Sequence, residues 1–415
     1  MRIAIVGAGI SGLVTAYLLC RDHEIVVYEA NDYIGGHTHT IDVEVEGGGT
    51  YPVDTGFIVF NEKTYPNFVK LLRQLDVPWQ ASKMSFSMRC GKTGLEYSPT
   101  SPNALFAQRR NLFRPAFLRM LLDIFRFRRE SEDLIRSGDN ETTLSAYLKA
   151  RGYSKWFRQY FIIPMGSAIW SADPIRFQDV PARFFAAFFH NHGFLQVWNQ
   201  PQWLAIRGGS RQYVEKLIDP FRDRIRPGCP VQSITRRGNH VEVRPRDGDI
   251  EPFDQCIIAA HSDQALSMIA DPTDAEIDVL SAVPYQENLT VLHTDSSMMP
   301  RHRSCWASWN AFMPKASRHA VMLTYNMNIL QALQAPVTFC VTLNQEQCVD
   351  PGKMIRKMTY HHPVYTSRGF AAQKRFQEIS GKDLIHFCGA YWGYGFHEDG
   401  VKSALAVCET FGKGL

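Results

Sequence analysis

Closely spaced cysteine pairs and a strong net charge are both missing from this chain of 415 residues. Its nine cysteines are scattered, with no CxxC pair and no zinc-ligand spacing, which argues against a structural zinc site and predicts reduced thiols in a cytoplasmic protein. The formal net charge is only +4, so charge gives no reason to expect a nucleic-acid partner. Repeats, low-complexity stretches and long linkers are absent too. What is present is ordinary globular composition, 45% hydrophobic and 21% charged, in a chain long enough for two or three domains or subdomains.

The most apolar stretch of the chain, residues 3–20, carries no charge and follows Arg2. A transmembrane helix or a signal peptide can share this pattern. Three glycines within six residues, Gly7, Gly9 and Gly12, argue against a stable helix running through it. We therefore expect no targeting segment and no membrane span, here or elsewhere.

These glycines form a G-x-G-x-x-G motif between an apolar run at residues 2–6, read as a buried strand, and a helix that continues to about residue 19. Gly7 permits the tight turn, Gly9 lets a pyrophosphate approach the backbone, and Gly12 allows the helix to pack close to the sheet. A lone motif of this kind is weak evidence. Its position between a strand and a helix strengthens the prediction of a dinucleotide site.

A second apolar run, residues 25–28, ends on Glu29, twenty-two positions after Gly7. The Glu29 carboxylate can accept hydrogen bonds from a ribose hydroxyl and would repel a phosphate on that ribose. The phosphates of the ligand would bind N–H groups at the helix N-terminus, at Ile10 and Ser11. FAD or NAD therefore fits this site, and NADP fits poorly.

Three later elements identify a family. Paired glycines, Gly35 and Gly36, follow the ribose-binding acid, residues 53–57 read Val-Asp-Thr-Gly-Phe, and residues 391–400 read Tyr-Trp-Gly-Tyr-Gly-Phe-His-Glu-Asp-Gly. In this order they resemble motifs of the FAD-dependent amine oxidase superfamily, which also contains carotenoid desaturases and protoporphyrinogen oxidase. Its members usually carry Arg after the two glycines, where this chain has His37.

The resemblance implies that the cofactor is FAD. Val231 would give adenine a backbone contact, and Ala260 would end the strand that returns the chain to the nucleotide domain. The strand at 384–390 and a helix from about Lys402 would present a positive helix end to the flavin, which stabilises its anionic reduced form. The expected cofactor-binding residues are Gly7, Gly9, Ile10, Ser11, Gly12, Glu29, Ala30, Gly35, Gly36, His37, Thr55, Gly56, Val231, Ala260, Gly389, Asp399, Gly400 and Val401.

The same resemblance implies an α/β fold, with a Rossmann-type FAD-binding domain of the GR2 type and an α+β substrate domain as in amine oxidases. The FAD-binding domain would be discontinuous, comprising residues 1–56, 208–285 and 366–415. The substrate domain would comprise residues 57–207 and 286–365.

The sequence also predicts local structure within these domains. Residues 230–260 read as three successive strands, and residues 83–89 alternate as a strand does. Helical segments dominate residues 103–190. No second G-x-G-x-x-G motif exists for a separate NADH domain; the nearest segment, residues 207–211, resembles a Gly-Gly element that amine oxidases place near the substrate side of the flavin. We therefore expect electrons to enter from substrate and to leave to oxygen or a carrier.

Two stretches of the expected substrate domain stand out. Residues 109–129 contain seven Arg against one Asp, with Phe and Leu interleaved at near-helical spacing. This is typical of a basic amphipathic helix in peripheral contact with anionic lipid at the inner membrane face, or of a solvated Arg face over a helix packed on the core. Residues 184–189 place Phe pairs four apart, either along an apolar tunnel or in an ordinary core. His190 and His192 lack further ligands, so we expect no metal.

For catalysis, the protein needs to position a C–H bond beside the flavin and exclude water, because the cofactor carries the chemistry. Amine oxidases frame the flavin with two aromatic side chains, and one of those positions matches His397. A histidine can do acid–base work there, or it can simply hydrogen-bond the flavin or its neighbours. Tyr391 and Trp392 of the same motif are the other candidate catalytic residues.

Details of residues 35–54 and 391–400 are similar to bacterial proteins related to the N-terminal region of plant cyclopropane fatty-acid synthases and to the flavoprotein of furan-fatty-acid formation. This resemblance favours dehydrogenation or desaturation of an apolar substrate, a lipid acyl chain. The alternatives are an amine oxidase that forms imine and hydrogen peroxide, a flavin-dependent fatty-acid double-bond isomerase, and a non-catalytic flavin-binding partner of a lipid methyltransferase.

Overall fold

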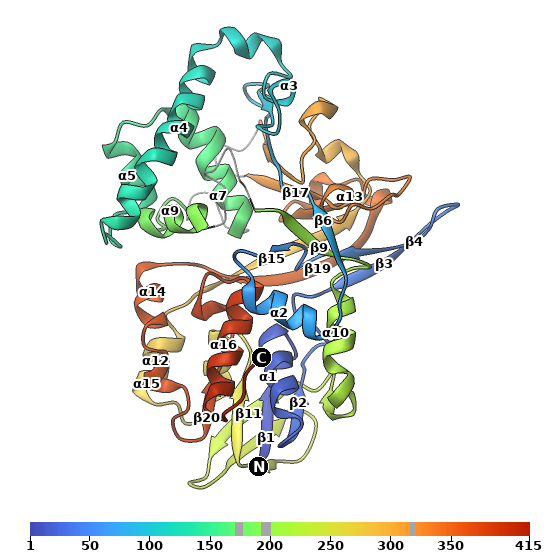
Figure 1. Cartoon of the computed structure of the whole chain (residues 1–415), viewed down its shortest axis with the longest axis vertical. Coiled ribbons are helices and arrows are strands. Elements are labelled where there is room, and N and C mark those ends of the chain that lie inside the picture. The colour runs from blue at the N-terminus through green and yellow to red at the C-terminus, as the bar shows by residue number, and fades with distance from the viewer. Residues whose placement is uncertain (171–176, 192–200, 316–320) are drawn as a thin grey trace.

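A five-stranded parallel sheet forms the base of the molecule in the computed structural model, which describes residues 1–170, 177–191, 201–315 and 321–415 (Figure 1). Successive residues of its apolar strands face opposite layers: Ile3 and Ile5 pack with the helical layer, and Ala4 and Val6 with the other. The strand order is β10 (Ile225–Arg226), β2 (Glu24–Tyr28), β1 (Arg2–Val6), β14 (Gln255–Ile258) and β20 (Ile385–Phe387).

Segments that are far apart in sequence meet in this sheet. Strand β14 pairs in parallel with β1, Ile257 opposite Ile5, and β20 pairs with β14, His386 opposite Ile257. The predicted return of the chain to the nucleotide domain is confirmed. Helices α1 (Ile10–Leu19), α10 (Arg211–Ile218) and α16 (His397–Glu409) supply the hydrophobic core on one face.

The opposite face is covered by a small antiparallel sheet and short helices. Between residues 230 and 260 the chain forms four strands, so the expectation of three was wrong. The missed strand contains Pro252 and lies at the edge of the sheet, where a proline costs no ladder hydrogen bond. These elements are β11 (Val231–Arg236), β12 (Val241–Pro245), β13 (Glu251–Phe253), α11 (Ser262–Met268), α12 (Asp274–Leu280), α14 (Ser367–Gln373) and α15 (Phe376–Ile379).

A seven-stranded sheet forms the base of the upper half of the view in Figure 1. Its strand near residue 83 begins at Phe86, three residues later than the sequence pattern suggested, and pairs in parallel with residues 309–313. The strand order is β19 (Met354–Pro363), β15 (Tyr285–His293), β18 (Cys340–Leu343), β17 (Met322–Asn326), β16 (Trp309–Met313), β7 (Phe86–Cys90) and β8 (Glu96–Tyr97).

Short elements connect the two sheets. They are β3 (Thr40–Val45) with β4 (Gly49–Asp54), the sheet of β5 (Phe60–Asn61), β9 (Trp203–Ile206) and β6 (Trp79–Ser82), and helices α2 (Pro66–Gln74) and α13 (Met327–Leu330).

Helices crown the seven-stranded sheet, as expected for residues 103–190. Residues 109–129 do not form one helix. They comprise a 3₁₀ turn, η1 (Arg109–Phe113), and the first part of α4 (Pro115–Arg136), because a proline favours extended backbone at the residue before it and a place at the start of a helix. The others are α3 (Pro102–Leu105), α5 (Leu144–Ala150), α6 (Lys155–Phe157), α7 (Ile163–Trp170) and α9 (Ala182–Asn191). None of the helices in the described ranges is long and apolar enough to cross a membrane.

Candidate active site and cofactor cavity

A cavity of about 750 Å³ is lined by residues from both the parallel sheet and the seven-stranded sheet. It gathers most of the cofactor-binding residues predicted from sequence, although they span nearly the whole chain. The predicted residues that line it are Gly7, Gly9, Ile10, Ser11, Glu29, Ala30, Gly36, His37, Gly56, Val231, Ala260 and Gly389.

The glycine loop has the geometry that a nucleotide requires. Gly7 has φ +108°, and a Cβ there would lie 2.7 Å from the carbonyl oxygen of Ala259. A Cβ on Gly12 would lie 1.9 Å from the Gly7 carbonyl oxygen, so this position needs glycine for close helix–strand packing. A Cβ on Gly9 would meet no described atom within 4 Å, which leaves the backbone of Gly9 open toward the cavity. Among the described side chains none caps α1, so its first N–H groups are available to an anion.

Glu29 is buried at the end of β2 and lines the cavity. Its Oε2 accepts the Ala8 N–H at 2.8 Å, and its Oε1 accepts the backbone and side-chain N–H groups of Asn31, both at 2.8 Å. These bonds orient the carboxylate toward the glycine loop. Carboxylate oxygens have further lone pairs, so Glu29 can also accept from ribose hydroxyls.

The second loop, residues 35–37, packs directly on the first. Gly35 has φ +131° and bridges to Gly9, and a Cβ on Gly36 would lie 3.0 Å from the Gly9 Cα. Gly56 is equally constrained, since its Cβ would lie 2.2 Å from the His37 carbonyl oxygen. Within the described structure, Nε2 of His37 is a buried nitrogen without a hydrogen-bond partner. Buried polar atoms usually have a hydrogen-bond partner, so this nitrogen beside the glycine loop is available to bond a polar ligand.

Six predicted cofactor residues do not line the cavity; they support the residues that do. Thr55 is buried, and its hydroxyl donates to the His39 carbonyl at 2.9 Å. A Cβ on Gly400 would lie 2.7 Å from Cγ2 of Ile10, so Gly400 lets α16 pack on α1. The six are Gly12, Gly35, Thr55, Asp399, Gly400 and Val401.

The closing helix, expected from about Lys402, starts at His397 instead. Asp399 explains the earlier start, because its Oδ2 accepts the N–H groups of Tyr394 at 2.9 Å and Phe396 at 3.0 Å and so caps the first turn. Burial raises the pKa of the Asp399 carboxyl to about 6, against the lowering effect of these bonds. The N-terminus of α16 therefore lies at the cavity, where Phe396 and His397 are lining residues.

His397 is buried at the cavity wall. Its Nε2 lies 3.0 Å from the Thr38 hydroxyl and 3.1 Å from the Tyr213 hydroxyl, and its ring stacks on Phe57. Burial, followed by the nearby His37, holds the pKa of the His397 imidazole well below its usual value. The ring is therefore neutral near pH 7 and held in one orientation, which agrees with either role proposed for it.

Of the other two candidate catalytic residues, Tyr391 and Trp392, only Tyr391 lines the cavity. Tyr391 is buried and lines the cavity, and its hydroxyl has no hydrogen-bond partner among the described residues. Trp392 is not a lining residue; its ring packs edge-on against Phe376, 5.0 Å away, in the core beneath the sheet. The two residues lie in a 3₁₀ turn at residues 390–392 with their ring centroids 4.9 Å apart, so Trp392 backs Tyr391 without reaching the cavity.

A group of histidines and tyrosines at the cavity was not predicted. Burial lowers the pKa of His261 to about 4 and of His362 to about 3, and the ring of His37 lies 5.2 Å from that of His362. One signal was available, because His261 directly follows the predicted residue Ala260. The group comprises His261, Tyr285, Tyr360, His361 and His362.

The apolar end of the cavity is the wall supplied by α7, α9, β16 and β17, whose described lining side chains are aromatic or aliphatic. Among the described lining residues Glu29 is the sole carboxylate, and it belongs to the nucleotide end. The phenylalanines of α9 have different surroundings. Phe188 lines the cavity, while Phe185 and Phe189 are buried in the core and do not line it. The apolar lining residues at this end are Met84, Ile169, Phe188, Trp309, Tyr325 and Phe396.

Asp54, from the Val-Asp-Thr-Gly-Phe motif at residues 53–57, is buried behind the cavity wall. Its Oδ1 accepts the Thr40 hydroxyl at 2.6 Å and the Ser210 hydroxyl at 2.8 Å, which ties β4 to the start of α10. Burial raises the pKa of Asp54 to about 6. The Gly-Gly segment at residues 207–211 packs against the same group of residues, since a Cβ on Gly209 would lie 2.6 Å from the Thr40 methyl group.

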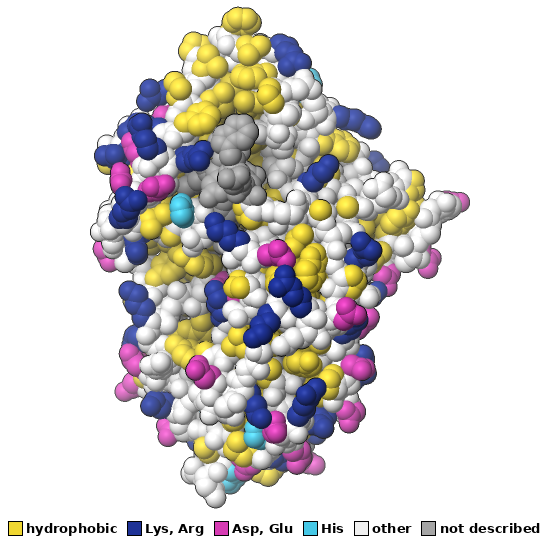
Figure 2. Space-filling model, viewed as in Figure 1, with side chains coloured by type: hydrophobic (Ala, Val, Ile, Leu, Met, Phe, Trp, Pro, Cys, Tyr) yellow, Lys and Arg dark blue, Asp and Glu magenta, His cyan; other side chains and the backbone are white. Residues whose placement is uncertain are grey.

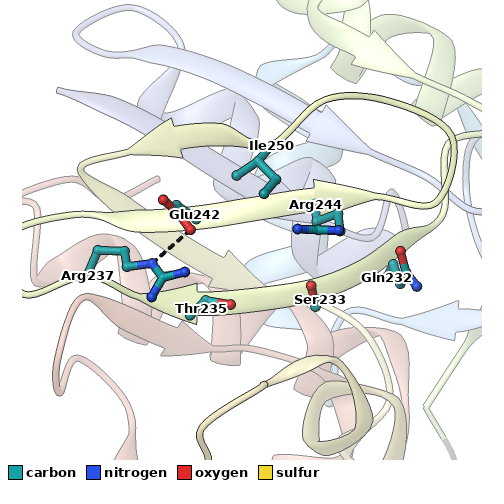
Figure 3. A pocket seen from close by; sticks show the side chains of 7 residues that line it. All are labelled: Gln232, Ser233, Thr235, Arg237, Glu242, Arg244 and Ile250. Carbon is teal, nitrogen blue, oxygen red and sulfur yellow. Dashed lines mark hydrogen bonds and ion pairs between the residues drawn. The ribbon is translucent and has the colours of Figure 1, made fainter.

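No group of three or more His, Cys, Asp or Glu side chains is arranged to hold a metal ion in the described parts of the chain, and His192 lies outside them. A second, smaller hollow of about 310 Å³ lies on β11 and β12 and shares no lining residue with the large cavity (Figure 3). Arg237 and Glu242 pair with each other there at 2.9 Å.

The large cavity fits FAD, with an open glycine at the turn, an uncapped helix end, the buried Glu29 carboxylate in its wall and a His37 nitrogen without a partner among the described residues. Residues 10–293 match the model of the family described as flavin containing amine oxidoreductase. The chain belongs to this family and is an FAD-dependent oxidoreductase. No curated protein matches the chain by sequence.

Solved structures share the whole fold. Putrescine oxidase bound to putrescine superposes with a TM-score of 0.70 at 12% identity, covering 99% of both chains. Cyclohexylamine oxidase from Brevibacterium oxydans IH-35A gives 0.68 at 17% identity, again over 99% of both chains. The CLA-producing fatty acid isomerase from P. acnes gives 0.70 at 15% identity, over 99% of this chain and 98% of that one.

Proposed function

We propose that this flavoenzyme removes hydride from a C–H bond of an apolar substrate, a lipid acyl chain. The observation that carries the proposal is the apolar end of the cavity, where hydrocarbon, aromatic and thioether side chains form the described wall without a carboxylate. A cationic polyamine would have to leave water without a counter-charge there, which is costly. An acyl chain exchanges water for apolar contacts at no such cost.

The residues divide the work between the two ends. Glu29 and the N-terminus of α1 bind the nucleotide half of FAD, and the aromatic and aliphatic wall holds the substrate and excludes water. FAD, when bound, supplies the hydride acceptor. His397 is held by the Phe57 ring and two hydroxyl groups. It would orient the flavin or the substrate where the nucleotide end of the cavity meets the apolar end.

Anaerobic titration of the FAD-loaded enzyme tests the proposal. Bleaching of the visible flavin band by unsaturated phospholipid or fatty acid, but not by putrescine or cyclohexylamine, is the expected result. Bleaching by amines alone overturns it in favour of an amine oxidase. Bleaching by none of these compounds would instead favour a non-catalytic role beside a lipid methyltransferase.

Met84 provides a matched pair of variants at the apolar end. Met84→Glu places a carboxylate in the wall and should raise KM for an acyl substrate by about tenfold or more, with FAD content unchanged. Met84→Leu conserves volume and should change little. Equal effects of the two substitutions would count against an apolar substrate.

Double-bond isomerisation is the second candidate, because a fatty acid isomerase shares the fold as closely as the amine oxidases do. Removal and return of hydride at one cavity would move a double bond without net oxidation. Product analysis distinguishes the two: the isomerase yields shifted double bonds with no oxygen or carrier consumed, and the dehydrogenase yields one added double bond for each acceptor reduced.

A further inference from the structure

Large apolar side chains on the surface gather on one segment of the chain. Nine such side chains are exposed in the described structure, and five of them lie between residues 112 and 125, so this segment is not ordinary surface. Phe113 is 86% exposed at the end of η1. The five are Leu112, Phe113, Leu118, Leu122 and Phe125.

Helix α4 has apolar residues on two opposite faces. Met120 and Phe127 are buried in the core of the upper half, as expected for a helix packed on its domain. Leu118, Leu122 and Phe125 are spaced four and three residues apart, so they form a second row along the exposed face. Core packing therefore explains only one of the two faces.

Arginines flank this exposed row, and the one acid within residues 109–129 is turned away from it. The exposed acids of α4, Glu132 and Asp133, lie beyond the row and pair with Arg136. Arg119 and Arg126 pair with acids of α4, whereas Arg128 and Arg129 form no ion pair within the described residues. The one acid among residues 109–129, Asp123, is 1% exposed, pairs with Arg119 at 3.4 Å and accepts the Ser154 N–H at 2.9 Å. Figure 2 shows hydrophobic side chains gathered at the top of the view with Lys and Arg side chains beside them.

The arginines beside the row help to decide what binds it, a second copy of the chain or a lipid bilayer. Two copies of the chain related by a twofold axis would bring the arginines of each copy against those of the other, which is unfavourable. An anionic bilayer offers negative headgroups to the arginines and an acyl boundary to the apolar row. No described segment of this chain covers the row, since all three of its side chains are exposed.

We infer that η1 and the first half of α4 form a docking surface for an anionic lipid bilayer. Phe113 and the row from Leu118 to Phe125 enter the headgroup–acyl boundary, and the flanking arginines bind lipid phosphates. Helix α4 packs on α9, whose Phe188 lines the cavity, so the surface and the cavity are joined by one helix. The inference goes beyond the proposed chemistry and does not depend on the acyl substrate.

Vesicle flotation of the FAD-loaded protein tests the inference. The protein should float with vesicles of equal parts phosphatidylcholine and phosphatidylglycerol, float poorly with phosphatidylcholine alone, and be released by salt. The paired substitution Leu122→Glu with Phe125→Glu should weaken flotation by about tenfold or more. Arg128→Glu with Arg129→Glu should remove the preference for anionic lipid.

Ile277→Glu is the matched control, because Ile277 is 44% exposed on α12, away from α4 (Figure 1). FAD content and thermal unfolding confirm that each variant is folded. Absence of wild-type flotation, retained flotation in the paired variant, or equal loss in the Ile277 control overturns the inference. A wild-type dimer that the paired variant splits, seen by light scattering without vesicle binding, also overturns it in favour of self-association.

Discussion

The ring of His397 lies parallel to that of Phe57, with centroids 3.6 Å apart and 11° between the planes. Phe57 follows the constrained Gly56, and His397 opens α16, so two distant motifs meet in this stack. The Nε2 of His397 is held by Thr38 and Tyr213, while the stack orients the ring. This contact joins the region of the second glycine loop to the closing motif at the cavity wall.

His397→Phe preserves a planar ring against Phe57 but removes both ring nitrogens. If His397 acts in acid–base chemistry, turnover should fall by about 100-fold or more while bound FAD is retained. Steady-state kinetics with flavin content measured in parallel checks this expectation. Tyr213→Phe is the control, because it removes one hydrogen bond to His397 outside the cavity lining and should reduce turnover much less. Unchanged turnover in His397→Phe would exclude the acid–base role.

Two glycines of the first motif should respond differently to alanine. Gly9 has φ −79° and no described atom within 4 Å of a Cβ, so Gly9→Ala should fold normally yet weaken FAD binding by about tenfold or more. Gly12→Ala would force a methyl group against the Gly7 carbonyl and should destabilise the apoprotein by about 1–3 kcal/mol. Thermal unfolding of apoprotein and fluorescence titration with FAD separate the two effects. Equal loss of stability in both variants would contradict the geometry.

His37 should make FAD affinity depend on pH. Burial, followed by His261 and His361, lowers the pKa of His37 to about 4 in the cofactor-free protein. An anionic diphosphate nearby favours the protonated imidazole and raises that pKa, so affinity should strengthen as pH falls from about 8 to about 6. His37→Arg should bind FAD with little pH dependence over this range. A wild-type affinity that is flat with pH would exclude proton uptake at this residue.

His293 should contribute to acid sensitivity of the fold. The buried Nδ1 accepts the Asp295 N–H at 3.0 Å, and Nε2 lies 2.7 Å from the Thr342 hydroxyl, so the neutral ring is required. Burial lowers the pKa of His293 to about 4, against an ordinary value of 6.5. The stabilisation is therefore present above about pH 6.5 and is lost as pH falls toward 4, amounting to about 3 kcal/mol.

Chemical unfolding at a series of pH values measures this loss. His293→Gln should be less stable than wild type near pH 7 and should show a flatter decline between about pH 6.5 and 4. Parallel curves for wild type and variant would show that another buried histidine dominates.

Local sequence patterns located the glycine loop and its acid, which lie within thirty residues of each other. The tight turn at Gly7 and the close packing at Gly12 match the geometry, and Gly9 is open toward the cavity, while their contacts with a nucleotide stay predictions. The edge strand at Glu251–Phe253 was missed because its proline reads as a break. The early start of α16 was missed because an acid caps it from inside its own first turn.

Other features depended on contacts between distant segments. Tyr391 and Trp392 are neighbours in sequence and their rings are in contact, but only the packed structure shows that Tyr391 lines the cavity and Trp392 does not. The histidines of β19 reach the cavity because β19 pairs with β15, which no local pattern encodes.

The sequence by itself determined a dinucleotide site, because backbone constraints at glycines and the period of buried strands are written in local spacing. The resemblance of its later motifs to a known family then implied FAD as the cofactor. Tertiary structure decided which end of the cavity is apolar, which ring supports His397 and which face of α4 meets solvent. Those properties depend on which distant surfaces exclude water together, and burial of that kind is settled only when the whole chain has packed.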